Sequence, residues 1–192
     1  MSFKGVTPFE AAPLKKMRKI ILIFSLFSVF LPGLSIAVDT KTVELAGTQI
    51  MNEKAPGIVM MDIAGHTFML KDLKGQAVIL HFWASWCSPC KEELPALEKI
   101  HQEFKDSGLT VLAVSIEANA DLTKMTGLAA SLGATFPVYT IRQGADAERY
   151  WSLGVPVTYF IDKNGSIIGR IIGEGRWSEE GVKRLVRKMA AE

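Results

Sequence analysis

The sequence predicts a domain of the α/β class, in which a central mixed β-sheet has helices on both faces. Between residues 78 and 133, apolar runs typical of buried strands alternate with segments of three- and four-residue hydrophobic spacing typical of helices. Two further strand-like runs and an amphipathic segment close the chain between residues 157 and 189. Strands that alternate with helices and then end in a hairpin are typical of a mixed sheet covered on both sides. With 48% apolar and 22% charged residues, the chain has the composition of an ordinary globular protein.

Residues 1–37 have the pattern of an export signal or a membrane anchor. A basic cluster at 15–19 precedes an uncharged stretch at 20–38, and small residues ending at Ala37 fit the pattern of a cleavage site. We prefer a signal cleaved after Ala37, because Pro32 interrupts a stretch that barely reaches the roughly 17–25 residues of a spanning helix. An uncleaved anchor is the alternative. Both interpretations export the rest of the chain, to the periplasm or to the outer face of the cytoplasmic membrane.

The distribution of charge argues against a nucleic-acid partner. Five of the 22 basic residues and one of the 20 acidic residues lie in residues 1–37. The remainder has 17 basic and 19 acidic residues, a net charge of −2. A slightly acidic domain lacks the basic surface that binds phosphates. We expect contact with a membrane only through the N-terminal segment, if it is retained.

The exported part is expected to begin with a hairpin. Residues 38–54 are polar and without clear period, so we assign them to a linker, with an edge segment of the sheet as the alternative, and place the domain at residues 55–192. Short apolar runs at 58–61 and 68–70 predict a β-hairpin. Residues 78–83 are apolar at five of six positions, which predicts a buried central strand.

The later elements follow from the same patterns. An amphipathic helix is predicted from Pro89 to about Ser107, where a glycine follows. The remaining elements, in order, are a strand at 110–116, a helix at 122–132, a short strand at 136–139, a short helix at 145–151, strands at 157–161 and 167–172 joined by the turn 162–165, and a final helix at 182–189.

The chain has only two cysteines, Cys87 and Cys90, which lie three positions apart. Any intramolecular disulfide must join these two, and so short a loop does little to restrict the unfolded chain. A chemical role is therefore favoured over a structural one, and a C-x-x-C between a strand and a helix indicates a redox motif.

The expected position of the pair supports this interpretation. Spacing i, i+3 on the first turn of a helix places both sulfurs on one face, close enough to bond. The free N–H groups and dipole of the helix N-terminus stabilise a thiolate, and Pro89 suits the first turn because it has no N–H to lose. We expect a redox-active disulfide in which Cys87 is the attacking thiolate and Cys90 the resolving thiol.

A metal site is the competing interpretation of the cysteine pair. Structural zinc commonly takes four Cys or His ligands, but no second cysteine pair exists, and His66, His81 and His101 are not spaced as ligands. We expect no resident metal and no cofactor. Copper delivery through the two thiols and a histidine is the alternative that stays open.

Four segments of the chain resemble the thioredoxin superfamily, and more specifically its TlpA/ResA-like thiol–disulfide oxidoreductases. They are the active-site signature at 82–90, the hairpin region from Ala55 to Gly75, the Glu93-Leu94-Pro95 that follows the second cysteine, and the loop and strand at 154–162. The resemblance extends from about residue 55 to the C-terminus. It implies a thioredoxin-like fold with an N-terminal β-hairpin extension.

The resemblance also implies roles for individual residues. Pro156 would be a cis-proline facing the disulfide, and Val155 would offer backbone groups to a partner peptide. Glu93, on the same helix face as Cys90, would be a buried acid that exchanges a proton with the resolving thiol. Trp86 would pack beside the disulfide in the substrate-binding region.

His81 departs from the family pattern. The position six before the first cysteine is an aspartate in thioredoxin and often an asparagine in this subfamily, so the proton pathway of thioredoxin cannot simply be transferred. A buried histidine is a candidate proton relay, because its ordinary pKa lies near neutrality. A neutral core histidine is the alternative, which we favour slightly.

These observations predict an exported protein-disulfide oxidoreductase that reduces partner proteins in the cell envelope. Proline between the cysteines favours a reductant, since the best reductants of this fold carry proline there. The resemblance implies a membrane electron donor of the CcdA/DsbD type and clients such as apocytochromes c, in cytochrome c biogenesis. A disulfide donor is the alternative. Peroxide reduction is less favoured, because related peroxidases have a threonine where Ala84 stands.

Overall fold

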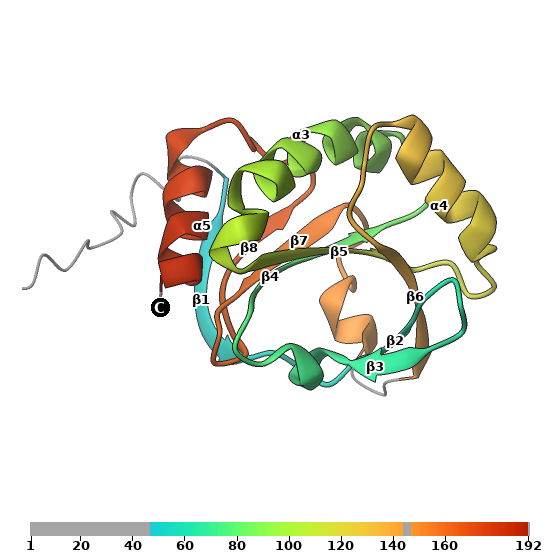
Figure 1. Ribbon diagram of the computed structural model, residues 1–192, viewed down its shortest axis with the longest axis horizontal. Coiled ribbons are helices and arrows are strands. Elements are labelled where there is room, and N and C mark those ends of the chain that lie inside the picture. The colour runs from blue at the N-terminus through green and yellow to red at the C-terminus, as the bar shows by residue number, and fades with distance from the viewer. Residues whose placement is uncertain (1–46, 144–146, 192) are drawn as a thin grey trace, which may run out of the picture. The chain divides into compact units, whose positions relative to one another are not determined.

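The computed structural model describes residues 47–143 and 147–191, which contain a mixed sheet of eight strands and three α-helices. The strands lie in the order β1-β8-β7-β4-β5-β6-β2-β3 (Figure 1). Their bounds are β1 Gln49–Lys54, β2 Val59–Met61, β3 Thr67–Met69, β4 Ala77–Trp83, β5 Leu109–Ser115, β6 Val138–Gln143, β7 Val157–Ile161 and β8 Ser166–Ile172. The α-helices are α3 Ser88–Phe104, α4 Leu122–Ser131 and α5 Glu180–Ala191, and the 3-10 helices are η1 Leu70–Leu73, η2 Lys105–Ser107 and η3 Ala147–Tyr150. The predicted mixed α/β fold is confirmed.

Strand β4 lies inside the sheet and is buried along its whole length. It pairs in parallel with β5 and antiparallel with β7. Because its two faces are both covered, almost every side chain is apolar. The exception is His81, which shares the face of Ile79 and Trp83 by the two-residue alternation of a strand.

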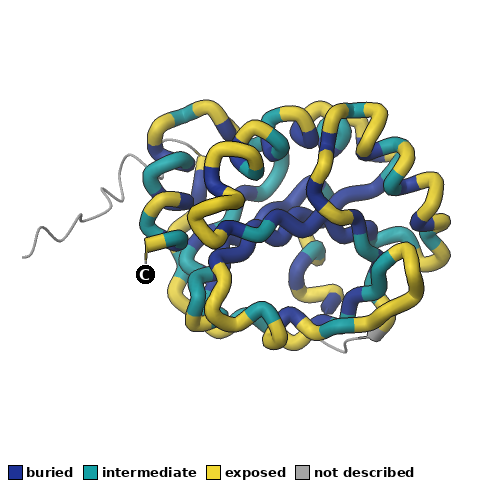
Figure 2. Tube along the Cα trace, in the orientation of Figure 1, coloured by how far each residue is buried: buried dark blue, intermediate teal, exposed yellow. Residues whose placement is uncertain are grey.

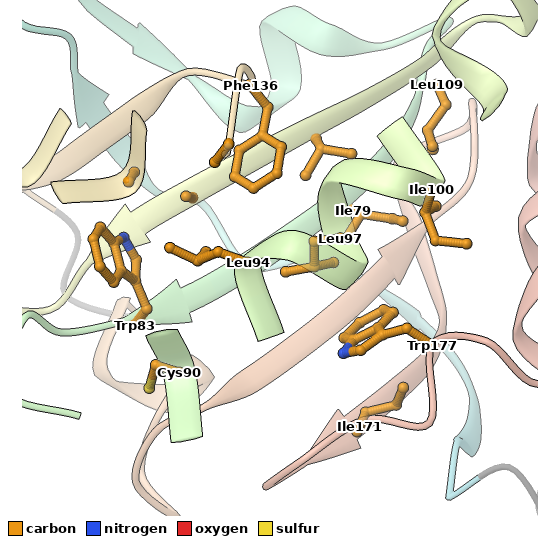
Figure 3. Packing of buried hydrophobic residues seen from close by; sticks show 14 of the residues in the cluster. Ile79, Trp83, Cys90, Leu94, Leu97, Ile100, Leu109, Phe136, Ile171 and Trp177 are labelled. Carbon is orange, nitrogen blue, oxygen red and sulfur yellow. The ribbon is translucent and has the colours of Figure 1, made fainter. Parts of the chain in front are cut away.

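The three α-helices pack against one face of the sheet (Figure 1). Their apolar side chains form a single cluster with those of β4 and β5 on that face. Figure 3 shows Leu94, Leu97 and Ile100 of α3 in this layer, near Ile79 of the sheet. The three- and four-residue spacing of these buried side chains is the pattern that predicted the helix.

Shorter elements cover the second face. A separate apolar cluster there centres on Phe82 and is enclosed by η1, η3 and the β2–β3 hairpin. The ring of Phe82 stacks on Tyr150 of η3, with 5.2 Å between centroids, and Tyr159 donates a hydrogen bond to the carbonyl of Tyr150 at 2.8 Å. The helical segments that cover this face are therefore the short 3-10 helices η1 and η3. Figure 2 shows the central strands buried between the two layers.

The domain begins earlier than the sequence predicted. Residues 49–54, assigned above to the linker, form β1, which pairs antiparallel with β8 at the edge of the sheet. Most side chains of β1 are exposed, so backbone hydrogen bonds rather than apolar burial hold it. An exposed edge strand leaves no hydrophobic period in the sequence. The boundary at residue 55 is therefore wrong, and the alternative of an edge segment describes residues 49–54.

The predicted hairpins are present. Strands β2 and β3 pair antiparallel, and β2 also pairs with β6, so the N-terminal hairpin extends the sheet. The turn between β7 and β8 depends on Asp162, whose carboxylate accepts the N–H groups of Asn164 and Ser166. Gly165 closes this turn with φ at 75°, a conformation that glycine adopts at little cost.

Within residues 47–143 and 147–191, none of the helices combines the length and the apolarity needed to cross a membrane. The uncharged stretch at 20–38, and with it the interpretation of residues 1–37 as a signal or anchor, lies outside the described residues.

Truncation of Leu97 to alanine is expected to destabilise the fold by about 2–5 kcal/mol, because its side chain is fully buried beneath α3 and a cavity would remain. The same substitution at Leu153, which is 66% exposed, should change the free energy of unfolding by less than about 0.5 kcal/mol. Urea denaturation of the two oxidised variants measures the difference. An equal loss of unfolding free energy in the Leu97 and Leu153 variants would contradict this packing.

Candidate active site

The two cysteines lie at the junction where the chain leaves β4 and enters α3. Cys87 is the N-cap of α3, and its Sγ accepts a hydrogen bond from the N–H of Cys90 at 3.3 Å. A disulfide joins the two residues, whose Cα atoms are 5.3 Å apart. Cys90 is fully buried, whereas Cys87 retains 4% exposure. Cys87 is therefore the sulfur that a partner can reach first.

The loop before β7 faces this disulfide. The carbonyl oxygen of Val155 lies 3.7 Å from Sγ of Cys87, and the Val155–Pro156 bond is cis, as the resemblance implied. The carbonyl of Pro156 accepts the N–H of Gly173 at 2.9 Å. This hydrogen bond ties the proline loop to the end of β8, so the loop has a fixed position beside the sulfurs.

The two tryptophans of the signature have different surroundings. Trp86 is 68% exposed directly before Cys87, and Leu153, two residues before Val155, is exposed to a similar extent. Trp83 is fully buried in the core beneath the helices (Figure 3). Trp86 is therefore available to a partner, whereas Trp83 is a core residue.

Glu93 is buried one turn beyond Cys90 on α3. Its Oε1 accepts the N–H of Gly175, and its Oε2 has no hydrogen-bond partner among the described residues. Burial, as the largest influence, raises the pKa of Glu93 to about 7, although the Gly175 N–H and the indole of Trp177 favour the ionised form. A carboxyl group with this pKa can both take and release a proton near neutral pH.

His81 is fully buried beside this acid. Its Nδ1 lies 2.9 Å from the hydroxyl of Thr158, its cross-strand partner on β7, and 3.9 Å from Oε2 of Glu93. Nε2 of His81 has no partner among the described residues. Burial lowers the pKa of His81 to about 3, so the ring is neutral at physiological pH.

Sequence reasoning missed several residues of the site. Thr158 lies in a strand that was predicted, but only the pairing of β7 with β4 shows that it meets His81. Glu117, just after β5, accepts the N–H of Ser85 at 2.6 Å and so holds the loop before Cys87. No local pattern predicts a contact across 32 residues of sequence.

Gly175 and Trp177 were also missed. They contact Glu93 from a segment 82 residues away in the sequence, beyond the end of β8. The one signal available in the sequence was Trp177, a large apolar residue that closely follows two glycines. In the structure Trp177 is only 3% exposed, although it lies in a loop.

Among the residues that the structure describes, no three His, Cys, Asp or Glu side chains are grouped in a way that could hold a metal ion. The group that the copper hypothesis proposed, the two cysteines together with a histidine, is therefore not found among those residues.

Comparison with known proteins identifies the family of this chain. The model of the AhpC/TSA family matches residues 51–170. The chain belongs to the AhpC/TSA family. It is 29% identical over 172 residues to "Thiol-disulfide oxidoreductase ResA" of Geobacillus kaustophilus, an alignment that covers 89% of this chain and 96% of that protein.

Solved structures agree with this assignment. A putative thiol:disulfide interchange protein DsbE from Chlorobium tepidum is 26% identical, with a TM-score of 0.61 over 72% of this chain and 96% of that one. The exposed lipoprotein thioredoxin Etrx1 of Streptococcus pneumoniae is 28% identical, with a TM-score of 0.55 over 69% of this chain and 98% of that one. The chain is thus a thiol–disulfide oxidoreductase with a thioredoxin-like fold, and it resembles the ResA group as predicted.

Replacement of Glu93 by glutamine should change how the stability of the oxidised protein depends on pH. The pKa of Glu93 is about 7 in the folded protein against an ordinary value of 4.5, so the folded state binds more protons between these pH values. The unfolding free energy therefore falls as pH rises from about 4.5 to 7 and is level above. Glu93→Gln removes this fall, so the variant should gain stability relative to wild type by up to about 3 kcal/mol across that range.

Urea denaturation at several pH values between 4.5 and 8 measures this difference. His81 acts in the opposite direction, because the unfolded chain takes up its proton below about pH 6.5, but its contribution is common to both proteins. Glu92→Gln, at the exposed neighbouring position, is the matched control and should show no such trend. A pH-independent difference between Glu93→Gln and wild type would contradict the burial of this acid.

Proposed function

We propose that this protein is an exported reductant that transfers two electrons from the Cys87–Cys90 dithiol to disulfides of partner proteins in the cell envelope. The observation that carries the proposal is the position of Cys87 at the N-terminus of α3, 3.7 Å from the Val155 carbonyl and next to a cis-proline. This arrangement provides both a stabilised thiolate and an adjacent backbone edge.

The reaction has two steps. The Cys87 thiolate attacks one sulfur of the partner disulfide, which forms a mixed disulfide and releases the first partner sulfur as a thiolate. The Cys90 thiolate then attacks Sγ of Cys87, which forms the Cys87–Cys90 disulfide and releases the second partner sulfur. The dithiol loses two electrons and the partner disulfide gains them. No cofactor takes part in either step.

Glu93 serves the second step as a proton acceptor. Cys90 is fully buried and needs a base to become a thiolate, and Glu93 follows it by one helical turn. Because the pKa of Glu93 is about 7, its carboxylate can take the Cys90 proton near neutral pH. His81 lies 3.9 Å from Glu93 through its Nδ1, but burial lowers its pKa to about 3, so we propose that it stays a neutral neighbour of the acid rather than a second proton site.

Partner peptides are proposed to bind across the exposed rim of the disulfide. Val155 offers backbone groups for a short β-like pairing, Pro156 shapes the loop, and Trp86 offers an exposed apolar surface. The chemistry favours an extended segment that contains a cystine and an apolar side chain.

The direction of electron flow and the partners belong to the same proposal. Pro89 between the cysteines favours a reductant, and the likeness to ResA supports a membrane electron donor of the CcdA/DsbD type with clients such as apocytochromes c. The likeness to an exposed lipoprotein supports export, as does the signal-like pattern in residues 1–37. Disulfide donation to clients is the alternative that the potential measurement below would reveal.

The reduction potential of Cys87–Cys90 in the full chain should lie near that of thioredoxin, about −270 mV, if the protein is a reductant. Equilibration with a dithiol redox buffer and thiol trapping measures it. A potential near about −120 mV would instead indicate a disulfide donor and would overturn the proposed direction.

Replacement of Cys90 by serine should trap a mixed disulfide between Cys87 and its partner, because the resolving thiol is missing. Cys87→Ser is the matched control and should trap little, since Cys90 is fully buried. Non-reducing electrophoresis of envelope extracts, followed by release with a reductant, compares the two. More adduct with Cys87→Ser than with Cys90→Ser would reverse the assigned roles.

A further inference from the structure

The segment between β8 and α5, residues 173–179, contacts two parts of the active site at once. We call it the β8–α5 loop. The N–H of Gly173 donates to the carbonyl of Pro156 at 2.9 Å, and the N–H of Gly175 donates to Oε1 of Glu93. Two backbone donors, two residues apart, thus connect the proline loop to the buried acid.

The glycine at position 175 is required by packing rather than by backbone conformation. A Cβ at Gly175 would lie 2.6 Å from Cε2, 2.8 Å from Nε1 and 2.9 Å from Cζ2 of Trp177. The backbone of Gly175 does not have the positive φ that the neighbouring Gly173 has. A side chain is excluded because the indole ring already fills that space.

Trp177 has little freedom to move aside. It is 3% exposed and belongs to the main core cluster, with its ring 6.1 Å from that of Phe160 between centroids. Figure 3 shows it beside Ile171 of β8. Its indole N–H makes no hydrogen bond among the described residues, yet it lies close enough to favour the ionised form of the Glu93 carboxyl. Because the ring fills the space beside Gly175, it limits where the Gly175 N–H can lie.

We propose that Gly175 and Trp177 are positioning residues that hold the Glu93 carboxyl in place for proton exchange with Cys90 and thereby set the pH range of the resolving step. This inference rests on the proton role proposed above for Glu93. The Gly175 N–H stabilises the ionised carboxylate in a buried site where the second oxygen has no hydrogen-bond donor. Loss of that N–H favours the protonated acid, which cannot accept the Cys90 proton.

Other titratable groups face Glu93 from each neighbouring element. Cys90 lies on α3 itself, His81 faces Oε2 from β4, and Glu174 of the β8–α5 loop adds a repulsive negative charge. The hydroxyl of Thr158 on β7 meets the His81 ring and carries no charge. Among these groups, none is a cation at neutral pH, so the backbone donor has no charged substitute.

Two cations beside the loop are paired with acids. A groove of about 620 Å³ lies between α3 and the β8–α5 loop, with Gly175 and Trp177 in its wall. Arg176 in this groove pairs with Glu179 at 3.1 Å, and Lys183 of α5 pairs with Glu103 of α3 at 2.6 Å. All four side chains are partly exposed to solvent, whereas Glu93 is buried.

The test compares two loop variants and a glycine control in the full chain, with Glu93→Gln as the reference for the acid itself. Gly175→Ala forces the loop away from Trp177, and Trp177→Phe keeps an aromatic ring but removes the indole N–H. Gly127→Ala in α4 is the matched control, because a Cβ there meets nothing within 4 Å. If Gly175→Ala does not fold, Trp177→Phe still tests the proposal.

The first readout is the titration of Glu93 itself in the oxidised protein, followed by carbon-13 NMR of labelled glutamate and assigned by its loss in Glu93→Gln. Loss of one hydrogen bond to a carboxylate is expected to raise the pKa of that carboxyl group by about 1–2 units. We therefore expect the midpoint to rise by about 1–2 units in Gly175→Ala, to rise by less in Trp177→Phe and to stay unchanged in Gly127→Ala. Unchanged midpoints in both loop variants would overturn the proposal.

The second readout is the pH profile of the resolving step, measured as release of a small aromatic thiol from a mixed disulfide at Cys87. The profile should shift to higher pH in Gly175→Ala in parallel with the Glu93 midpoint. If Glu93→Gln shifts the profile and neither loop variant does, the positioning role is wrong. If Glu93→Gln itself leaves the profile unchanged, the proton role of Glu93 fails, whatever the loop does.

Discussion

The packing of α3 onto the central sheet is the constraint on which the rest of the site depends. β4 is buried on both faces, and only residues 84–87 separate it from α3, so the N-terminus of the helix is held close to the end of the strand. Cys87 caps that turn, and the opposing loop brings the Val155 carbonyl to 3.7 Å from its sulfur. The apolar residues of α3 that fix the helix on the sheet thus also fix the distance between the sulfur and the proline loop.

The same packing confines the acid–base groups. Because α3 packs on the face of the sheet to which His81 points, Glu93 of α3 and His81 of β4 lie 3.9 Å apart inside the core. Burial raises the pKa of Glu93 to about 7 and lowers that of His81 to about 3. Near neutral pH the ring is therefore uncharged, while the carboxyl group is divided between its protonated and ionised forms and can exchange a proton with Cys90.

Most of the fold and the two sulfurs were predictable because they are encoded locally. The helix at 88–104 and the strand at 77–83 leave hydrophobic periods in the sequence, and Cys87 and Cys90 are the only cysteines. The remainder depends on contacts between distant segments. β1 is held by backbone bonds that leave no side-chain pattern, so the sequence offered it only as the alternative to a linker. Gly175 meets Glu93 across 82 residues, and no local pattern predicts that contact.

The most direct test of this account is the pKa of the Cys87 thiol in the reduced full chain, measured from the pH dependence of its alkylation rate. A thiol at the start of α3, with the Cys90 N–H directed at its sulfur, should titrate well below the ordinary value of about 8.5, and Cys90 should titrate above Cys87. The same measurement in denaturant should return about 8.5 for both cysteines. A folded-state pKa of Cys87 at or above about 8.5 would contradict the account, because the helix N-terminus would then provide no activation.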